Sequence, residues 1–78
     1  MHEVGVAKEV LSLCLEKAGG KRIRAIKVEL GNDGHTTAQS FTRAFEMVAV
    51  NSVAANAKLT VVQGSELESR VIDLVVDI

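Results

Sequence analysis

The first twenty residues alternate apolar and polar side chains in the rhythm of a helix with one buried face. Charged and polar residues such as Lys8, Glu9 and Glu16 fall opposite the apolar ones, as expected of a helix that packs against a core. Glycines follow at positions 19 and 20, and glycine favours the left-handed conformation that ends many helices. The pattern predicts an amphipathic helix over about residues 4–18. Its buried face consists of Ala7, Val10, Leu11, Cys14 and Ala18.

A strand and a second helix are expected next. Ile26, Val28 and Leu30 alternate with charged residues, which is typical of a strand with one buried face, and Gly31 begins the turn that ends it. After that turn, Thr36 and Gln39 have the spacing of a capping box, the pair of reciprocal hydrogen bonds that starts many helices. The second helix should reach about residue 50. Its apolar face consists of Phe41, Ala44, Phe45 and Val48.

Two further strands complete the chain. In the first of them, Ala57, Leu59 and Val61 lie on one side. The four residues Gln63–Glu66 are expected to join it to the last strand as a tight hairpin. The inner side of the last strand would consist of Ile72, Leu74, Val76 and Ile78, and its outer side of Val71, Asp73, Val75 and Asp77. The outer valines are either ordinary surface residues or a surface for self-association or a partner, so a homodimer is possible.

The order of elements is helix, strand, helix, strand, strand. This order predicts an α+β fold with two helices packed on one face of a three-stranded mixed sheet, in a single domain over residues 1–78. The intervening helix would make the first two strands parallel if they are adjacent, and the hairpin would make the last pair antiparallel.

Composition narrows the range of functions. Nine basic and ten acidic residues give a net charge of -1, and Phe41 and Phe45 are the only aromatic residues, so we expect no nucleic acid as partner. The basic cluster of Lys21, Arg22, Arg24 and Lys27 is interpreted as the solvated edge of a strand. The chain shows no phosphate loop, nucleophile elbow or HExxH motif, so we expect no enzyme.

The single cysteine and the length of the apolar runs add two expectations. Cys14 falls on the apolar face of the first helix, which predicts a core residue rather than a nucleophile, and one cysteine cannot form a CxxC zinc site. No apolar run approaches the roughly 20 residues that span a bilayer, and the start lacks the basic and apolar regions of a signal peptide. We therefore expect a cytoplasmic protein without a membrane partner.

The opening residues Met1, His2 and Glu3 suggest a metal site. The amine of Met1, the backbone amide of His2 and the His2 imidazole lie within one short chelate. Such nitrogen donors suit square-planar Ni(II) or Cu(II). The amide of Glu3 would supply a fourth nitrogen, and its carboxylate would lie axial or outside the coordination shell. Because any chain with histidine as its second residue binds these ions to some degree, the three residues alone leave an incidental site open.

Several segments together resemble one protein family. "MHEVGVAKEVL" resembles the amino terminus of the HypA/HybF family of nickel-insertion accessory proteins for hydrogenase and urease maturation. "KRIRAIKVELG" has the spacing of the family's first strand, and "SFTRAFE" resembles its second helix. "QGSEL" and "VIDLVVDI" resemble its last strand. The resemblance covers nearly the whole chain in the family's order.

The resemblance implies a nickel metallochaperone that binds Ni(II) through Met1, His2 and Glu3 and delivers it. The implied partners are a nickel-handling GTPase and the hydrogenase large subunit precursor. Because the ligands must be deprotonated, nickel affinity should fall as the pH drops through the histidine range.

Two departures from the family bear on this implication. Family members insert a zinc domain with two CxxC pairs between the last two strands, where this chain has only the turn at 63–66, so we expect no zinc. The acid that assists nickel in some members aligns near Thr37, and Asp33 or His35 in the same loop are candidates to replace it. The alternative function is a divergent member that acts as a protein-interaction module without a metal.

Overall fold

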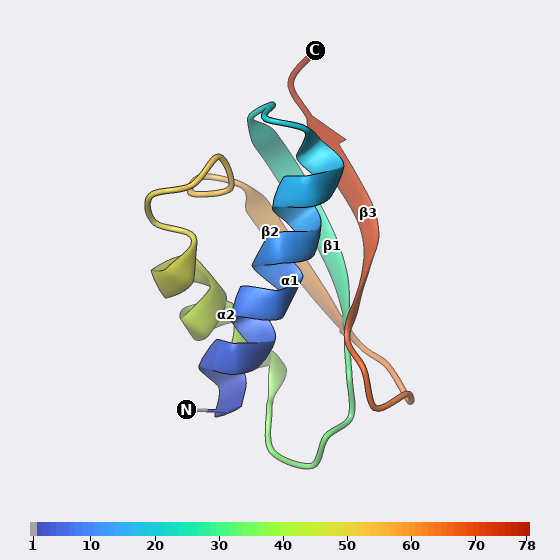
Figure 1. Cartoon of the computed structure of the whole chain (residues 1–78). Coiled ribbons are helices and arrows are strands. Elements are labelled where there is room, and N and C mark those ends of the chain that lie inside the picture. Colours follow the sequence, from blue (N-terminus) through green and yellow to red (C-terminus); the bar gives the residue numbers. More distant parts are fainter. Residues whose placement is uncertain (1) are drawn as a thin grey trace.

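The computed structural model describes residues 2–78 and contains two helices and one three-stranded sheet (Figure 1). The helices lie on one face of the sheet, as predicted. In chain order the elements are α1 (His2–Ala18), β1 (Ile23–Leu30), α2 (Ala38–Val48), β2 (Lys58–Gln63) and β3 (Arg70–Val76).

The core lies between the helices and the inner face of the sheet. Helix α1 contributes Val10 and Cys14, and α2 contributes Phe41 and Phe45, whose rings lie 5.8 Å apart. Strand β1 buries four side chains, which are Ile23, Ile26, Val28 and Leu30. Burial raises the pKa of the Cys14 thiol to about 11, which confirms a core residue rather than a reactive nucleophile.

Helix α1 begins earlier than predicted and ends where predicted. It starts at His2, and Gly19 and Gly20 follow its last residue with φ angles of 59° and 87°. The N–H of Gly19 donates to the carbonyl of Leu15, as in a left-handed C-terminal cap. Neither helix of the described chain has the length and apolar composition needed to cross a membrane.

The predicted capping box was wrong by one residue. Thr37 is the N-cap of α2 and exchanges hydrogen bonds with Ser40, whereas Gln39 is exposed. Thr36 is buried and donates its hydroxyl to Asp33 at 2.9 Å, so it belongs to the preceding loop. The helix ends at Val48, two residues before the predicted end.

The predicted hairpin between the last two strands was also wrong. Strand β1 lies in the centre of the sheet, parallel to β2 and antiparallel to β3, so β2 and β3 do not pair. The segment 64–69 instead crosses the end of β1. There, the N–H of Gly64 donates to the Leu30 carbonyl and the N–H of Asn32 donates to the Glu66 carbonyl. A Cβ on Gly31 would lie 2.2 Å from the carbonyl oxygen of Leu67, so this crossing requires glycine.

The predicted faces of β3 were correct in only one half of the strand. Leu74 and Val76 pack against the core, but Ile72 is 45% exposed and Val71 turns inward. Ile78, which was also predicted inside, lies beyond the end of β3 and is exposed. The register shifts between Lys27 and Val28, because Lys27 lies opposite Asp73 and Val28 lies opposite Val71. Ile72 therefore occupies a β-bulge, which inverts the in–out alternation on its two sides.

Candidate metal site

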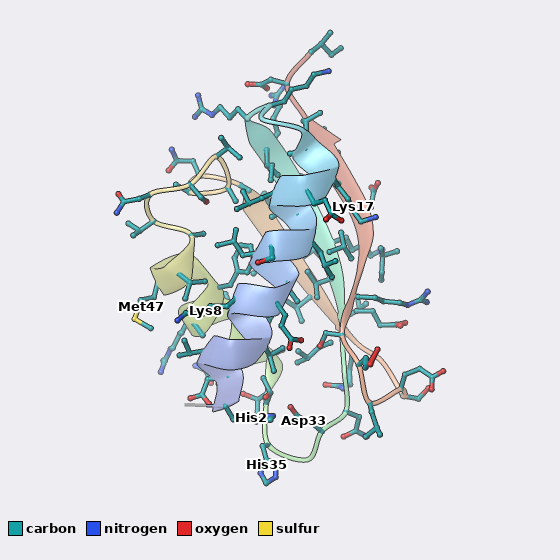
Figure 2. All side chains as sticks on the ribbon, in the orientation of Figure 1. His2, Lys8, Lys17, Asp33, His35 and Met47 are labelled. Atoms are coloured by element: carbon teal, nitrogen blue, oxygen red, sulfur yellow. The ribbon has the colours of Figure 1, made fainter. Side chains whose placement is uncertain are left out.

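The amino-terminal turn of α1 lies against the loop that connects β1 to α2 (Figure 2). Nε2 of His2 lies 2.6 Å from Oδ2 of Asp33, although 31 residues separate them in the chain. The His2 side chain is 54% exposed, whereas that of Asp33 is 20% exposed. The structure therefore places the predicted ligand His2 in contact with Asp33, which is one of the two residues considered as assistants in nickel binding.

The Asp33 carboxylate is held by its own loop. Its Oδ1 accepts hydrogen bonds from the backbone N–H groups of His35, at 2.8 Å, and Thr36, at 2.7 Å. Its Oδ2 accepts the Thr36 hydroxyl in addition to facing His2. These hydrogen bonds hold the pKa of the Asp33 carboxyl well below its usual range, and the two from backbone N–H groups have the largest effect. Asp33 is therefore an ionised acceptor that the loop has fixed in place.

The Asp33 contact assigns the two nitrogens of the His2 ring. A neutral imidazole has one N–H donor and one lone-pair nitrogen. Because an ionised carboxylate only accepts hydrogen bonds, Nε2 carries the hydrogen and donates to Asp33. The lone pair then lies on Nδ1, which is the nitrogen nearer to the backbone.

The ring of His35 lies beside the His2–Asp33 pair and takes no part in the hydrogen bond between them. The centroids of the His2 and His35 rings are 5.6 Å apart, and the ring planes meet at 68°, an edge-to-face arrangement. His35 is exposed and its label in Figure 2 lies at the outer tip of the loop. No hydrogen bond joins the two rings in the described part of the chain.

The backbone of the first turn offers further nitrogens. The first four N–H groups of an α-helix have no acceptor within the helix, and those of His2 and Glu3 are among them. A metal that displaces these hydrogens breaks no helical hydrogen bond. The amine of Met1 lies outside the described residues.

The Glu3 side chain lies on a different face of α1 from His2. It lines a hollow between α1 and α2 together with Ser40, Arg43 and Met47. The structure thus does not bring the Glu3 carboxylate to the His2–Asp33 pair. Within residues 2–78, no three side chains of His, Cys, Asp or Glu are grouped so that they could hold a metal ion.

The comparison with known families identifies the chain. Residues 1–70 match the model of the family described as "Hydrogenase/urease nickel incorporation, metallochaperone, hypA". The chain belongs to the HypA family.

Individual HypA proteins are similar over most of this chain. The hydrogenase maturation factor HypA of Geotalea daltonii is 30% identical over 61 residues, which are 78% of this chain and 56% of the relative. That of Methanosarcina acetivorans is 31% identical over 64 residues, 78% of this chain and 48% of the relative. The chain thus spans about half the length of these HypA relatives.

A solved HypA structure has a similar fold. The solution structure of the Ni metallochaperone HypA from Helicobacter pylori superimposes with a TM-score of 0.67 and 27% sequence identity. The match covers 80% of this chain and 56% of that protein.

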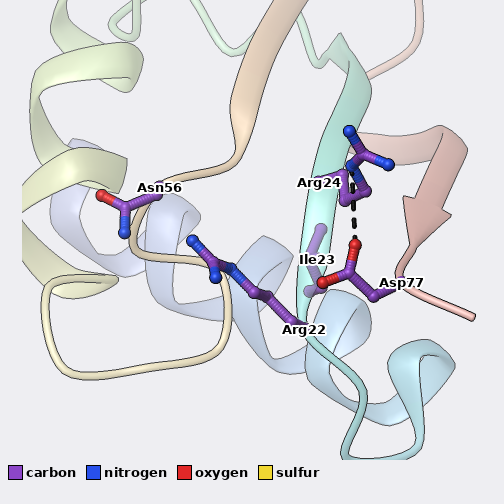
Figure 3. A pocket seen from close by; sticks show the side chains of 5 residues that line it. All are labelled: Arg22, Ile23, Arg24, Asn56 and Asp77. Atoms are coloured by element: carbon purple, nitrogen blue, oxygen red, sulfur yellow. Dashed lines mark ion pairs between the residues drawn. The ribbon is translucent and has the colours of Figure 1, made fainter.

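A second hollow lies at the opposite end of α1 from His2 and is lined by the basic cluster of this HypA chain (Figure 3). Arg22 and Arg24 border it together with Asn56, and Nε of Arg24 lies 3.5 Å from Oδ1 of Asp77. Both arginines are exposed, in agreement with a solvated end of a strand. His2 and these two arginines therefore lie at opposite ends of α1.

Sequence reasoning found part of the site. It selected His2 from its position, and it placed Asp33 and His35 in one loop. It missed Thr36, which it assigned to the helix cap, although an aspartate three residues before a threonine is a common loop-closing pattern. Nothing in the local pattern indicates that Asp33 contacts His2.

Proposed function

We propose that this HypA protein binds one Ni(II) ion at its amino terminus for delivery during maturation of a nickel enzyme such as hydrogenase. The ligands are the amine of Met1 and the amide and Nδ1 nitrogens of His2, which can lie in one plane through two fused chelate rings, with Glu3 as the adjoining residue of the site. The observation that supports this proposal is the His2–Asp33 contact at 2.6 Å, because it leaves Nδ1 as the lone-pair nitrogen beside the backbone amide.

The charge at the end of the helix agrees with this set of ligands. A helix amino terminus carries a partial positive charge, which disfavours a bare divalent cation. Deprotonation of the His2 backbone amide would lower the charge of the Ni(II) complex, so α1 would repel it less. These donors also favour the square-planar geometry of Ni(II) over the oxygen-rich sites of magnesium or calcium.

The role is that of a carrier rather than a catalyst. A chelate at the end of a chain is open to solvent, so a recipient can approach the ion and replace its ligands one at a time. We propose the two recipients that the family resemblance implies, a nickel-handling GTPase and the hydrogenase large subunit precursor.

Equilibrium dialysis against Ni(II) at neutral pH would test the assignment of the site. Wild-type protein should bind one equivalent, and His2→Ala should bind at least about tenfold more weakly, a loss of about 1.4 kcal/mol. His35→Ala is the matched control, since it removes the second imidazole of the same cluster, and its affinity should stay close to that of wild type.

Equal nickel binding by wild-type protein and His2→Ala would contradict the proposed site. It would favour the alternative, a protein-interaction module. In that case the surface to probe differs from the one the sequence suggested, because Ile72 and Val75 are 45% and 46% exposed whereas Val71 packs against the core.

A further inference from the structure

We propose that Asp33 is a positioning residue for nickel, which fixes the tautomer and orientation of the His2 imidazole so that Nδ1 is presented to the metal. This inference rests on the proposed function. It assigns Asp33 a place behind the ligand rather than in the coordination sphere.

The hydrogen bonds of Asp33 determine the direction of its contact with His2. Oδ1 already accepts two backbone N–H groups, and Oδ2 accepts the hydroxyl of Thr36. The remaining contact of Oδ2 is Nε2 of His2, at 2.6 Å, a short hydrogen bond of the kind that an ionised acceptor favours. Both oxygens act as acceptors, so Nε2 is the donor.

The anchoring shows which partner positions the other. Asp33 is fixed by Thr36 and the backbone of the loop before α2, and most of its side chain is covered. His2 lies in the first turn of α1, and more than half of its side chain is exposed. The loop therefore holds the carboxylate, and the carboxylate holds the ring.

The chemistry of the chelate makes this orientation useful. Nδ1 and the backbone amide nitrogen of His2 can bind one metal in a short ring, whereas Nε2 lies on the far side of the imidazole. Histidine ligands commonly donate their other N–H to a carboxylate, which sets the tautomer and makes the ligand more basic. Asp33 stands in that relation to His2. It prepares the ring for a nitrogen chelate before the metal arrives.

Asp33→Asn is the most direct variant, because it keeps the size and most of the hydrogen bonds. The asparagine oxygen can still accept from the N–H groups of His35 and Thr36. Its NH₂ group replaces Oδ2 and donates toward Nε2, so the ring hydrogen moves to Nδ1. Nickel must then displace that hydrogen. We expect the variant to bind Ni(II) about 10- to 100-fold more weakly, the range seen when such partners of metal ligands are changed.

Asp73→Asn is the matched control. It removes the same charge from the outer face of β3, where Asp73 lies opposite Lys27. Its nickel affinity should remain within about twofold of wild type if the effect of Asp33→Asn is not one of net charge, which distant exposed groups change only weakly.

A second readout does not depend on nickel. Nitrogen-15 NMR of the metal-free protein, at a pH above the histidine range, reports which ring nitrogen carries the hydrogen. We expect the Nε2–H tautomer for His2 in wild-type protein and the Nδ1–H tautomer in Asp33→Asn. A structural role of Asp33 in the loop would not exchange these tautomers. The wild-type spectrum also tests the proposal if the variant does not fold.

The outcomes separate this inference from the function on which it rests. A wild-type protein that binds no nickel would overturn the proposed function. A wild-type protein that binds nickel while Asp33→Asn binds it equally well would overturn the positioning role alone. The Nδ1–H tautomer in wild-type protein would also overturn the positioning role.

Discussion

His2 and Cys14, one in the first turn of α1 and one near its end, differ in their exposure to solvent. His2 is exposed and its ring is held from outside the helix by Asp33, whereas Cys14 is completely buried four residues before the end of the helix. The exposed position would leave a metal bound at His2 open to exchange. The buried position removes the thiol from chemistry, because burial raises its pKa to about 11.

The buried thiol predicts a pH dependence of stability. A thiol in the unfolded chain has a pKa near 8.5, which is lower than the pKa of Cys14 in the folded protein. The contribution of the Cys14 thiol to folding stability is therefore complete below about pH 8.5. It is lost as the pH rises toward 11, because the thiol of the unfolded state releases its proton first. Urea unfolding between pH 7 and 10 checks this, with Cys14→Ala as the control. The stability of the wild type should decline relative to that of the variant, and parallel curves would contradict the assignment.

The same burial predicts slow chemical modification. A thiol-specific reagent at pH 8 should label Cys14 in the folded protein much more slowly than in urea, because only the exposed thiolate reacts. Labelling at the same rate in both conditions would show that the face of α1 that carries Cys14 is accessible to solvent.

At the scale of elements, two features decide how the sheet is assembled, namely the crossing of segment 64–69 over the end of β1 and the bulge at Ile72. Neither was accessible from the sequence pattern. In β3, apolar residues stand on both sides of the strand, so alternation alone does not choose a register. The helices and β1 were predicted well because each has a single apolar face.

The bulge makes Ile72 and Leu74 unequal. Ile72→Thr should change the free energy of unfolding by no more than about 0.5 kcal/mol, as at most surface positions. Leu74→Thr should lower it by about 2 kcal/mol, since it removes packing against the core and buries a hydroxyl. Both variants place the same β-branched residue, threonine, in the strand. Denaturant titration compares the two variants. Equal losses of unfolding free energy would contradict the bulge at Ile72.

The crossing segment makes Gly31 essential for stability. Gly31→Ala places a methyl group against the backbone of Leu67 and should destabilise the protein by about 1–3 kcal/mol. Gly5→Ala, in the middle of the first two turns of α1, meets no atom within 4 Å and should stabilise by about 0.5–1 kcal/mol. The same unfolding experiment measures both. A neutral Gly31→Ala would mean that segment 64–69 does not lie on β1.

At the scale of the whole molecule, the candidate site is assembled from two stretches that lie far apart in the chain. The packed core positions α1 and the loop before α2, so the His2–Asp33 contact is a consequence of the tertiary fold. This explains why the sequence could indicate His2 through its position and through family resemblance, but not its partner. A contact over 31 residues depends on how helices and strands pack.

Because the core consists of protein side chains, the fold should not require nickel. Thermal unfolding in a strong chelator should remain cooperative, and added Ni(II) should raise the midpoint, since a ligand at 100 times its dissociation constant adds about 2.7 kcal/mol. Loss of helical circular dichroism in the chelator alone would contradict this expectation. Such a loss would indicate a metal with a structural role.

We propose that nickel binds through the amine of Met1 and the backbone amide of His2, and blocking that amine tests the proposal most directly. Protein that begins at Met1 should be titrated with Ni(II) in parallel with protein carrying one additional residue before Met1. We predict one equivalent and a diamagnetic, square-planar spectrum for the first, and loss of that spectrum for the second. The same spectrum from both, or weak binding by both without planar geometry, would contradict the account.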